Sequence, residues 1–315
     1  MSYPYLSDVV KALTGLDLPL PIAMFGLFVA LAMLAAAACL SAELRRMHAI
    51  GQLGNARRQV RHPDGTVSWI ETPPQEIVAN LTLTVMLAGV VGARLFHILE
   101  HTDQFMAAPW DMIFSRSGLS VFGGLILGTV AGIVFIRRWQ LPARPLLDAV
   151  APAMMLGYAI GRIGCQVSGD GDWGTVSNVA LKPDWLPLWT WAQTYDNNIY
   201  GELIAAPGVY PTPMYETAMA LLCFGVLWRL RKHGFQTGWL FALYLLLAGV
   251  ERLLIEQIRV NPAFDLGLVQ ATQAEIVAAA LIVCGLAGLA LLSRSKAACA
   301  PVRAAPAGQS KRRQS

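Results

Sequence analysis

Three arginines, Arg94, Arg162 and Arg252, stand inside otherwise apolar stretches of this 315-residue chain. A guanidinium in hydrocarbon costs at least a few kcal/mol, so it persists only where a partner, water or a ligand offsets that cost. Guanidinium groups bind phosphate and carboxylate oxygens with two parallel hydrogen bonds. If the three residues lie at one depth, they predict a shared pocket for an anion. The alternative is that each arginine reaches the lipid headgroups on its own.

The elements that position these arginines are apolar helices. The chain is 55% hydrophobic and 14% charged, with a mean hydropathy of +0.49, which excludes an ordinary soluble domain of this length. Runs of roughly 20 apolar residues, long enough to cross a bilayer, occur near 20–40, 76–99, 119–138, 146–165, 213–230, 238–256 and 269–292. We therefore expect an all-α membrane domain over residues 1–293 with about seven spans, followed by a basic, disordered tail at 294–315.

The distribution of lysine and arginine predicts the orientation of these helices. Basic residues gather in alternate connections, at 45–61, 137–144 and 229–232, and again in the tail at 294–313. The intervening connections and the N-terminus hold only Lys11, Arg116, Lys182 and Arg259. Because cytoplasmic loops carry the excess of basic residues, the N-terminus is expected outside and the C-terminus in the cytoplasm.

This orientation places the three buried arginines near one face of the membrane. The helices expected at 76–99, 146–165 and 238–256 then run outward, and each carries its arginine in its last one or two turns. Their shared depth follows from the topology and not from their separation along the chain. The anion pocket is therefore expected at the extracytoplasmic face.

The stretch from Gly161 to Gly174 is the most specific part of the sequence. It takes the fourth helix to its outer end and then interrupts it with glycines, beside Asp170 and Asp172. Irregular backbone at this depth is tolerated where protein or a wet cavity satisfies its polar groups. The extracytoplasmic loop that follows, about 166–212, is rich in acidic residues and tryptophans, which indicates an interfacial anchor or a lid over the outer leaflet.

Several motifs of the chain, between about residues 20 and 290, resemble those of one known family. Gly161–Gly174 resembles its signature Gly-Arg-x-Gly-Asn-Phe-x-Asn-Gly-Glu-x-x-Gly, and Gly118–Ile126 resembles its Gly-Met-Ser-Phe-His-Gly-Gly-Leu-Ile. Arg252–Arg259 is similar to its Arg-x-x-x-Glu-x-x-Arg. Further resemblances lie at Gly92-Ala93-Arg94, at Asp148-Ala149-Val150-Ala151-Pro152 and at Pro211–Glu216. Together these motifs make the chain similar to the prolipoprotein diacylglyceryl transferase family.

The resemblance implies a multi-pass transferase of the bacterial inner membrane. Members of the family move the diacylglyceryl group of phosphatidylglycerol onto the thiol of the lipobox cysteine in a prolipoprotein signal peptide, forming a thioether and releasing glycerol 1-phosphate. Arg162 and Arg252 are expected to hold the phosphate and stabilise its developing charge, with Arg94 structural or at the entrance. The other residues expected to contact substrate are Ser168, Gly169, Gly174, Tyr215, Glu216, Glu256 and Arg259.

The chain also departs from the family pattern around its arginines. Phe122 stands where the family has a histidine, Cys165 where the signature has an asparagine, and Phe25 and Ala248 where it has tyrosines; the signature is also one residue longer before Gly174. The reaction must therefore use another base or a thiolate that forms in solution. Candidates are His97, three residues beyond Arg94 on the same helical face, together with Asp170, Asp172 and Glu256, and Cys165 is a less favoured covalent nucleophile. Each also has a structural interpretation, as a packed histidine, a counter-ion or a packed cysteine.

The alternatives that remain open from sequence share the same arginines. One is a homologue that uses another anionic lipid or another acceptor, and one is a non-catalytic protein that binds or transports anionic lipid. Membrane lipids are the expected surroundings, and no nucleic-acid partner is expected. No spacing typical of metal ligands stands out, so neither a metal nor an organic cofactor is expected.

Overall fold

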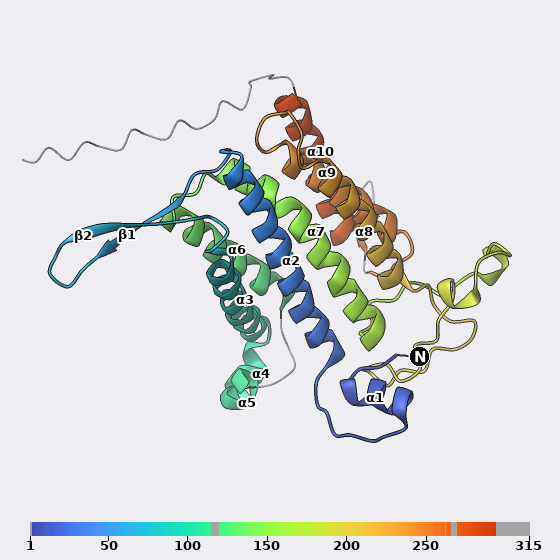
Figure 1. Ribbon diagram of the computed structural model, residues 1–315. Coiled ribbons are helices and arrows are strands. Elements are labelled where there is room, and N and C mark those ends of the chain that lie inside the picture. The colour runs from blue at the N-terminus through green and yellow to red at the C-terminus, as the bar shows by residue number, and fades with distance from the viewer. Residues whose placement is uncertain (1, 115–119, 262, 266–269, 294–315) are drawn as a thin grey trace, which may run out of the picture. The chain divides into compact units, whose positions relative to one another are not determined.

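The structure is a computed structural model that describes residues 2–114, 120–261, 263–265 and 270–293 (Figure 1). The chain divides into two compact units. The first is built from residues 2–40 and 146–293, and the second from residues 41–145. The helices are α1 (Leu6–Thr14), α2 (Met24–Ala49), α3 (Val78–Glu100), α4 (Thr102–Ala107), α5 (Pro109–Phe114), α6 (Val121–Arg138), α7 (Ala143–Ser168), α8 (Thr212–Leu230), α9 (Trp239–Glu256) and α10 (Gln273–Ser293).

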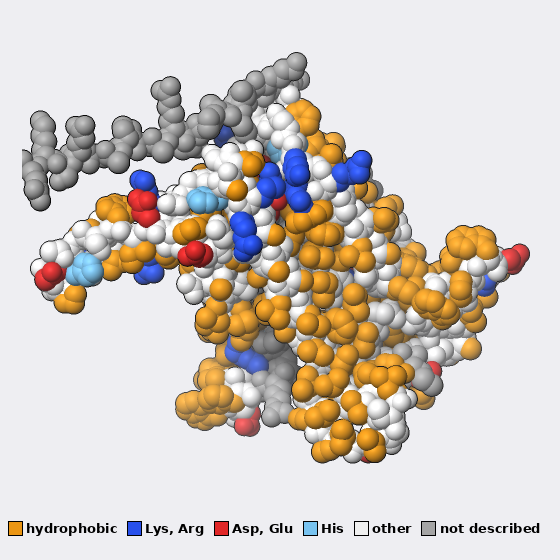
Figure 2. Space-filling view, viewed as in Figure 1, with side chains coloured by type: hydrophobic (Ala, Val, Ile, Leu, Met, Phe, Trp, Pro, Cys, Tyr) orange, Lys and Arg blue, Asp and Glu red, His pale blue; other side chains and the backbone are white. Residues whose placement is uncertain are grey.

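Each expected apolar stretch coincides with one long helix, namely α2, α3, α6, α7, α8, α9 or α10. Within the described residues, 4 helices, α2, α3, α7 and α10, are long and apolar enough to cross a membrane by length and composition. Figure 2 shows hydrophobic side chains over much of the surface that faces the viewer. Leu125, Leu222 and Val283 are among the large hydrophobic side chains that are well exposed. An apolar exterior of this kind suits helices that face lipid. The mostly helical fold is thus confirmed and is compatible with a membrane protein, while seven spans and the orientation of the termini stay predictions.

The expectation of a purely helical chain is wrong in detail. Strands β1 (Ala56–Arg61) and β2 (Val67–Thr72) form an antiparallel hairpin, and β3 (Ala263–Asp265) pairs with β4 (Gln270–Thr272). The first hairpin turns at Asp64-Gly65, where Gly65 has φ +81° and the amide of Thr66 donates to Asp64 Oδ1 at 2.9 Å. Asp-Gly between two polar, β-branched segments is a hairpin signal. The hairpin forms in a stretch whose basic residues otherwise indicate only a loop.

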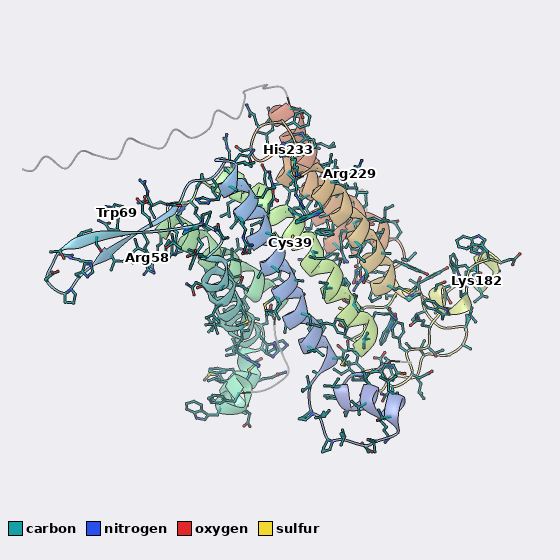
Figure 3. All side chains as sticks on the ribbon, in the orientation of Figure 1. Cys39, Arg58, Trp69, Lys182, Arg229 and His233 are labelled. Carbon is teal, nitrogen blue, oxygen red and sulfur yellow. The ribbon has the colours of Figure 1, made fainter. Side chains whose placement is uncertain are left out.

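In the first unit, neighbouring helices run in opposite directions. The start of α10 meets the end of α9, because Thr272 Oγ1 donates to Glu256 at 2.6 Å, and the other ends meet where Trp239 Nε1 donates to Ser293 Oγ at 2.9 Å. Arg162, near the end of α7, contacts Glu216, near the start of α8. Figure 3 places Arg229 and His233 at the end of the unit where α8 ends, and Lys182 in the loop beyond the opposite end.

Buried polar groups and small residues fix the helix contacts of this unit. The carboxylate of Asp148 on α7 accepts from the amides of Gly238 and Phe241 at 2.6 and 3.0 Å, so it caps the start of α9, where an anion is favoured. Between α9 and α10 the backbones touch, because a Cβ added to Gly285 would lie 2.6 Å from Leu246 N. Close contact through small residues is the usual packing of membrane helices.

The loop at 169–211 is partly folded on itself through its aromatic residues. Tyr195 is fully buried, and its ring packs at a tilt against Trp173 with ring centroids 5.2 Å apart. Trp191 packs edge-on against Tyr210. Two tryptophans of the loop, Trp185 and Trp189, are exposed. We therefore expect these two side chains to be the ones that anchor the loop at the membrane interface.

In the second unit, α3 and α6 pack backbone to backbone. A Cβ added to Gly92 would lie 2.3 Å from Gly123 O, and one added to Gly123 would lie 2.2 Å from Gly92 O. Gly123 belongs to Gly118–Ile126, the stretch that resembles a motif of the transferase family. Its role in this chain is therefore helix contact. The predicted tail at 294–315 lies outside the described residues.

Candidate active site

The charged centre of the first unit is built around Arg162, near the end of α7. Its Nη2 lies 3.0 Å from Glu216 Oε1 on α8, and its Nη1 binds a carboxylate oxygen of Asp172 in the following loop. Its Nε donates to the hydroxyl of Tyr158 at 3.3 Å, one turn earlier on the same helix. Arg162 thus ties α7 to α8 and to the broken loop, as expected for a charge that an apolar helix must neutralise.

Glu216 is the hub of the network. Its side chain is fully buried, and its Oε1 is approached by Arg162, by Arg252 Nη1 at 3.5 Å and by Arg259 Nη1 at 3.6 Å. Tyr158 also donates to this oxygen, at 3.1 Å. Its other oxygen, Oε2, has no hydrogen-bond partner within the described part of the chain. Because buried acceptors are nearly always satisfied, Oε2 is a place where a ligand hydroxyl could donate.

Asp172 bridges two arginines with its two oxygens. Oδ2 binds Arg162, and Oδ1 lies 2.5 Å from Arg259 Nη2. Burial alone would raise the pKa of Asp172, but the two guanidinium groups outweigh burial and hold that pKa below its ordinary value. The side chain is still 32% exposed, more than those of the arginines it binds. Asp172 is therefore a firmly ionised carboxylate at the accessible side of the network.

The backbone around Gly174 holds this loop in place. Gly174 pairs with Arg259 in an isolated antiparallel bridge, and its amide donates to Tyr210 O at 2.9 Å. A Cβ at Gly174 would lie 2.5 Å from Ile258 O, so no other residue fits. The hydroxyl of Thr212 also donates to Asp172 O at 2.5 Å. The pairing of Gly174 brings the loop that carries Asp172 beside Arg259, while its predicted contact with substrate stays a prediction.

Arg252 is held by carboxylates from two helices. Its Nη2 lies 2.9 Å from Glu256 Oε2 one turn later on α9, in addition to the contact with Glu216. Glu256 Oε1 accepts from Asn261 at 2.7 Å and from Thr272 at 2.6 Å. Glu256 is thus occupied as a counter-ion and as a link to the start of α10, which favours its structural interpretation over a role as base.

Two residues of the network were missed in the sequence. Glu251 is buried on α9, and its Oε1 lies 3.4 Å from the hydroxyl of Tyr158, which also contacts Arg162 and Glu216. An acidic residue inside an apolar stretch is itself a functional signal. Tyr158 precedes Arg162 by one helical turn, the spacing at which side chains meet. The sequence therefore contained a signal for each residue, one next to Arg252 and one a helical turn before Arg162.

Cys165 and the two aspartates of the broken loop form a second grouping. The thiol of Cys165 and the carboxylates of Asp170 and Asp172 offer atoms that all lie within 4.8 Å of one another. Arg162 Nη1 lies 3.7 Å from Cys165 Sγ and also binds Asp172. The guanidinium of Arg162 therefore supplies the positive charge beside these three residues. Burial raises the pKa of Asp170 above its ordinary value. A carboxylate of raised pKa beside a thiol is suited to proton transfer.

Three predicted contact residues lie outside the network. Ser168 is buried and donates back to Gly164 O at 2.8 Å. Gly169 adopts φ +61°, with a Cβ position only 2.9 Å from Ser2. The hydroxyl of Tyr215 donates to Thr190 O at 2.7 Å in the long loop. All three residues thus have contacts within the protein, and their predicted contact with substrate stays a prediction.

Arg94 and His97 belong to the second unit. Arg94 Nη1 donates to Met112 O at 3.1 Å, so this arginine fastens α3 to α5. His97 is half-buried beside His101, with ring centroids 4.5 Å apart. Their expected place beside Arg162 stays a prediction. Phe122 is well exposed on α6.

The fold and the site define a helical membrane protein with a buried network of arginines and carboxylates at one end of its helices. Within this class the chain can be assigned further. Residues 12–291 match the family described as prolipoprotein diacylglyceryl transferase, and the chain belongs to that family.

Similar proteins carry the name phosphatidylglycerol–prolipoprotein diacylglyceryl transferase. One from Leptospira interrogans is 34% identical over 208 residues, covering 58% of this chain and 62% of its own length. One from Shouchella clausii is 31% identical over 189 residues, with 60% and 65% covered. One from Symbiobacterium thermophilum is 30% identical over 230 residues, with 70% and 78% covered. The match thus spans less than two thirds of the first two proteins.

Proposed function

We propose that this protein transfers the diacylglyceryl group of phosphatidylglycerol to the thiol of the lipobox cysteine in a prolipoprotein. Membership of the family and the names of its relatives support this activity. The observation that carries it is Asp172, whose two carboxylate oxygens each bind a different arginine. This is the arrangement that two phosphate oxygens would need.

In this proposal the lipid phosphate takes the place of the Asp172 carboxylate. A phosphodiester and a carboxylate each carry one negative charge, so the exchange leaves the charge of the network unchanged. Asp172 stands on a loop and is the more exposed partner of both ion pairs, whereas Glu216 is fully buried. Arg162 and Arg259 then grip the phosphate with charge-assisted hydrogen bonds. This revises the pair expected from sequence, because Arg252 is already held by Glu216 and Glu256.

The chemical step needs a base beside the attacking thiol. We assign this role to Asp170, whose raised pKa brings it closer to neutral pH. The thiol proton passes to Asp170, the sulfur forms a bond to the glycerol carbon that bears the phosphate, and the carbon–oxygen bond breaks. Glycerol 1-phosphate leaves with the bonding electrons, and its developing charge is stabilised by Arg162 and Arg259. Glu216 Oε2 is available to a headgroup hydroxyl.

The same proposal sets the protein in the bacterial inner membrane with seven spans and the network facing outward. It is supported by the basic residues of alternate connections and by the opposite directions of neighbouring helices in the first unit. The network lies at the end of the helices away from Arg229 and His233 (Figure 3). That end would face the outer leaflet, where the lipid and the signal peptide are both present.

The departures from the family pattern keep two alternatives in view. Phe122 and Cys165 replace polar family residues, which favours a homologue with another anionic lipid or another acceptor. A non-catalytic protein that binds anionic lipid would use the same arginines and need no base. These alternatives differ from the proposal in the products that they form.

The test measures product formation by the purified full-length chain. Protein, phosphatidylglycerol and a lipobox peptide are incubated, and both glycerol phosphate and the lipidated peptide are quantified. Parallel reactions replace the lipid with phosphatidylethanolamine or the peptide cysteine with serine. We expect both products only with the matched substrates, and complementation of a strain depleted of its own transferase. Lipid binding without either product would contradict the proposal and favour the non-catalytic alternative.

A further inference from the structure

We propose that His97, Glu100 and His101 form a binding site for a divalent transition metal, with zinc as the best fit. The three side chains end the last turn of α3 and lead into α4. Each offers one ligand atom, and these atoms all lie within 4.8 Å of one another. The inference is independent of the proposed transferase function. It departs from the expectation, drawn from sequence, that the chain has no metal site.

The spacing along the helix produces this convergence. Residues three and four apart lie on the same face of a helix, so His97 meets both Glu100 and His101. Zinc binds imidazole nitrogen at about 2.0 to 2.1 Å, so neighbouring ligands of a tetrahedral ion are about 3.3 Å apart. The ligand atoms of the three side chains now lie within 4.8 Å of one another. Rotation of the side chains can bring these atoms to the spacing that zinc needs, because Glu100 and His101 are exposed and His97 is half-buried.

Neighbouring groups already orient two of the three ligands. His101 Nδ1 lies 3.1 Å from His97 O, so a proton on Nδ1 is donated to that carbonyl and Nε2 keeps the lone pair that a metal needs. Ser120 is buried, and its hydroxyl donates to Glu100 Oε1 at 2.8 Å. Partners of this kind fix the tautomer and the direction of metal ligands in known sites. Their presence distinguishes this cluster from a chance pair of surface histidines.

The donor set selects the ion. Two imidazoles and one carboxylate are the ligands of many zinc sites that keep a fourth position open, whereas magnesium and calcium prefer oxygen alone. The site also stands at the C-terminal end of α3, where the helix dipole favours a cation. We therefore expect one zinc ion with three protein ligands and one exchangeable position.

A bound zinc ion would change what His97 can do in catalysis. A histidine whose lone pair is bound to zinc cannot accept a proton. In the metal-bound protein His97 is therefore excluded as the base that replaces the family histidine, which leaves Asp170 as the best-placed candidate.

The test measures zinc binding directly. Full-length protein without a polyhistidine tag is freed of metal with a chelator in detergent and titrated with zinc by calorimetry. We expect one high-affinity ion per chain, with binding at least tenfold weaker in His97→Asn and in His101→Asn. His62→Asn is the matched control, because His62 is an exposed histidine of the β1–β2 hairpin bonded to Ser68. That control should bind as the unmutated protein does.

Two further variants make the outcome decisive. Glu100→Gln should weaken binding if the carboxylate is a ligand, and Ser120→Ala should weaken it by about tenfold if the hydroxyl orients that carboxylate. The thermal unfolding of each metal-free variant is measured to confirm that the fold is retained. Unchanged zinc affinity in the His97→Asn, His101→Asn double variant would overturn the site. Unchanged affinity in Glu100→Gln would overturn its three-ligand form.

Discussion

At the residue scale, the arginines of the site are distinguished by their partners. Arg162 and Arg259 share the accessible carboxylate of Asp172, whereas Arg252 is enclosed by Glu216 and by Glu256 of its own helix. An exchange of anions is simplest at the first pair, since Asp172 alone has to move. Arg252 instead belongs to the set of arginines that surround the buried carboxylate of Glu216. Substitutions of Arg162 and Arg259 should therefore affect phosphate binding more directly than substitutions of Arg252.

The first prediction compares conservative substitutions of these arginines. Lysine keeps the charge but loses the planar, two-pronged donor geometry, so Arg162→Lys and Arg259→Lys should each lower turnover by roughly 30- to 1000-fold, on the order of 2 to 4 kcal/mol in the barrier. Arg229→Lys, an exposed position at the far end of α8, is the matched control and should retain full activity. The measurement is the initial rate of glycerol phosphate release. Near-normal rates in both site variants would rule out the phosphate clamp.

The second prediction concerns the pH dependence set by Asp170. Because burial raises the pKa of Asp170, the carboxylate gains a proton, and ceases to act as a base, at a higher pH than an ordinary aspartate near 3.9. Activity should therefore fall as the pH is lowered through this raised pKa. Asp170→Asn should reduce the rate at neutral pH by about 100-fold or more and abolish this acidic limb. Profiles of kcat/KM against pH test both statements, and an unchanged profile in Asp170→Asn would assign the limb to another group.

At the element scale, helix contacts hold the network together. Asp148 ties the start of α9 to α7, and the close contact of α9 with α10 supports the helix that carries Glu251 and Arg252. The loop after α7 is in turn fixed against the end of α9 by the pairing of Gly174 with Arg259. The position of each charge therefore depends on backbone contacts several residues away.

The third prediction tests the contact between α9 and α10. Gly285→Leu adds a side chain where a Cβ would already lie 2.6 Å from Leu246 N and 2.9 Å from Ala242 O. Neither backbone atom can yield alone, so the helices must separate, at a cost of at least about 1 to 3 kcal/mol of stability. Gly225→Leu on α8 is the matched control, because nothing lies within 4 Å of a Cβ there. Thermal unfolding in detergent should show a lower Tm for Gly285→Leu only, and equal values would contradict the contact.

At the scale of the whole molecule, the charges of the connections set the topology. Basic residues gather in alternate connections, and in the first unit the charged network and the basic end of α8 lie at opposite ends of the helices. An outward-facing network would place the arginines beside the lipid leaflet and the exported acceptor that the proposed reaction requires.

The fourth prediction is the topology itself. Reporter fusions after Arg58 and after Lys232 should be cytoplasmic, and a fusion near Asn197 should be extracytoplasmic, because lysine and arginine favour the cytoplasmic side. Insertion at each site is verified by the amount of full-length fusion in the membrane fraction. A cytoplasmic signal from the fusion near Asn197 would place the network on the inner face and remove the support for the proposed donor and acceptor.

The sequence by itself determined the long helices and the presence of an unusual charged site. Hydropathy is a local, additive property, so seven apolar stretches could be located, and Arg162 and Arg252 stood out because a charge in hydrocarbon is costly. The β1–β2 hairpin was missed although Asp64-Gly65 marked its turn. Glu251 and Tyr158 were missed although each lay within one turn of a selected arginine.

Only the tertiary structure decided which charges are partners. Arg162, Glu216 and Arg259 come from separate segments, and they meet because α7, α8 and the end of α9 share one end of the unit. The pairing of Asp172 with both arginines depends on a loop that folds back through Gly174 onto Arg259. Electrostatic energy depends on distance in space, and those distances arise from packing between elements. For this reason the sequence could nominate the arginines, but the choice of Arg162 and Arg259 as the phosphate pair required the fold.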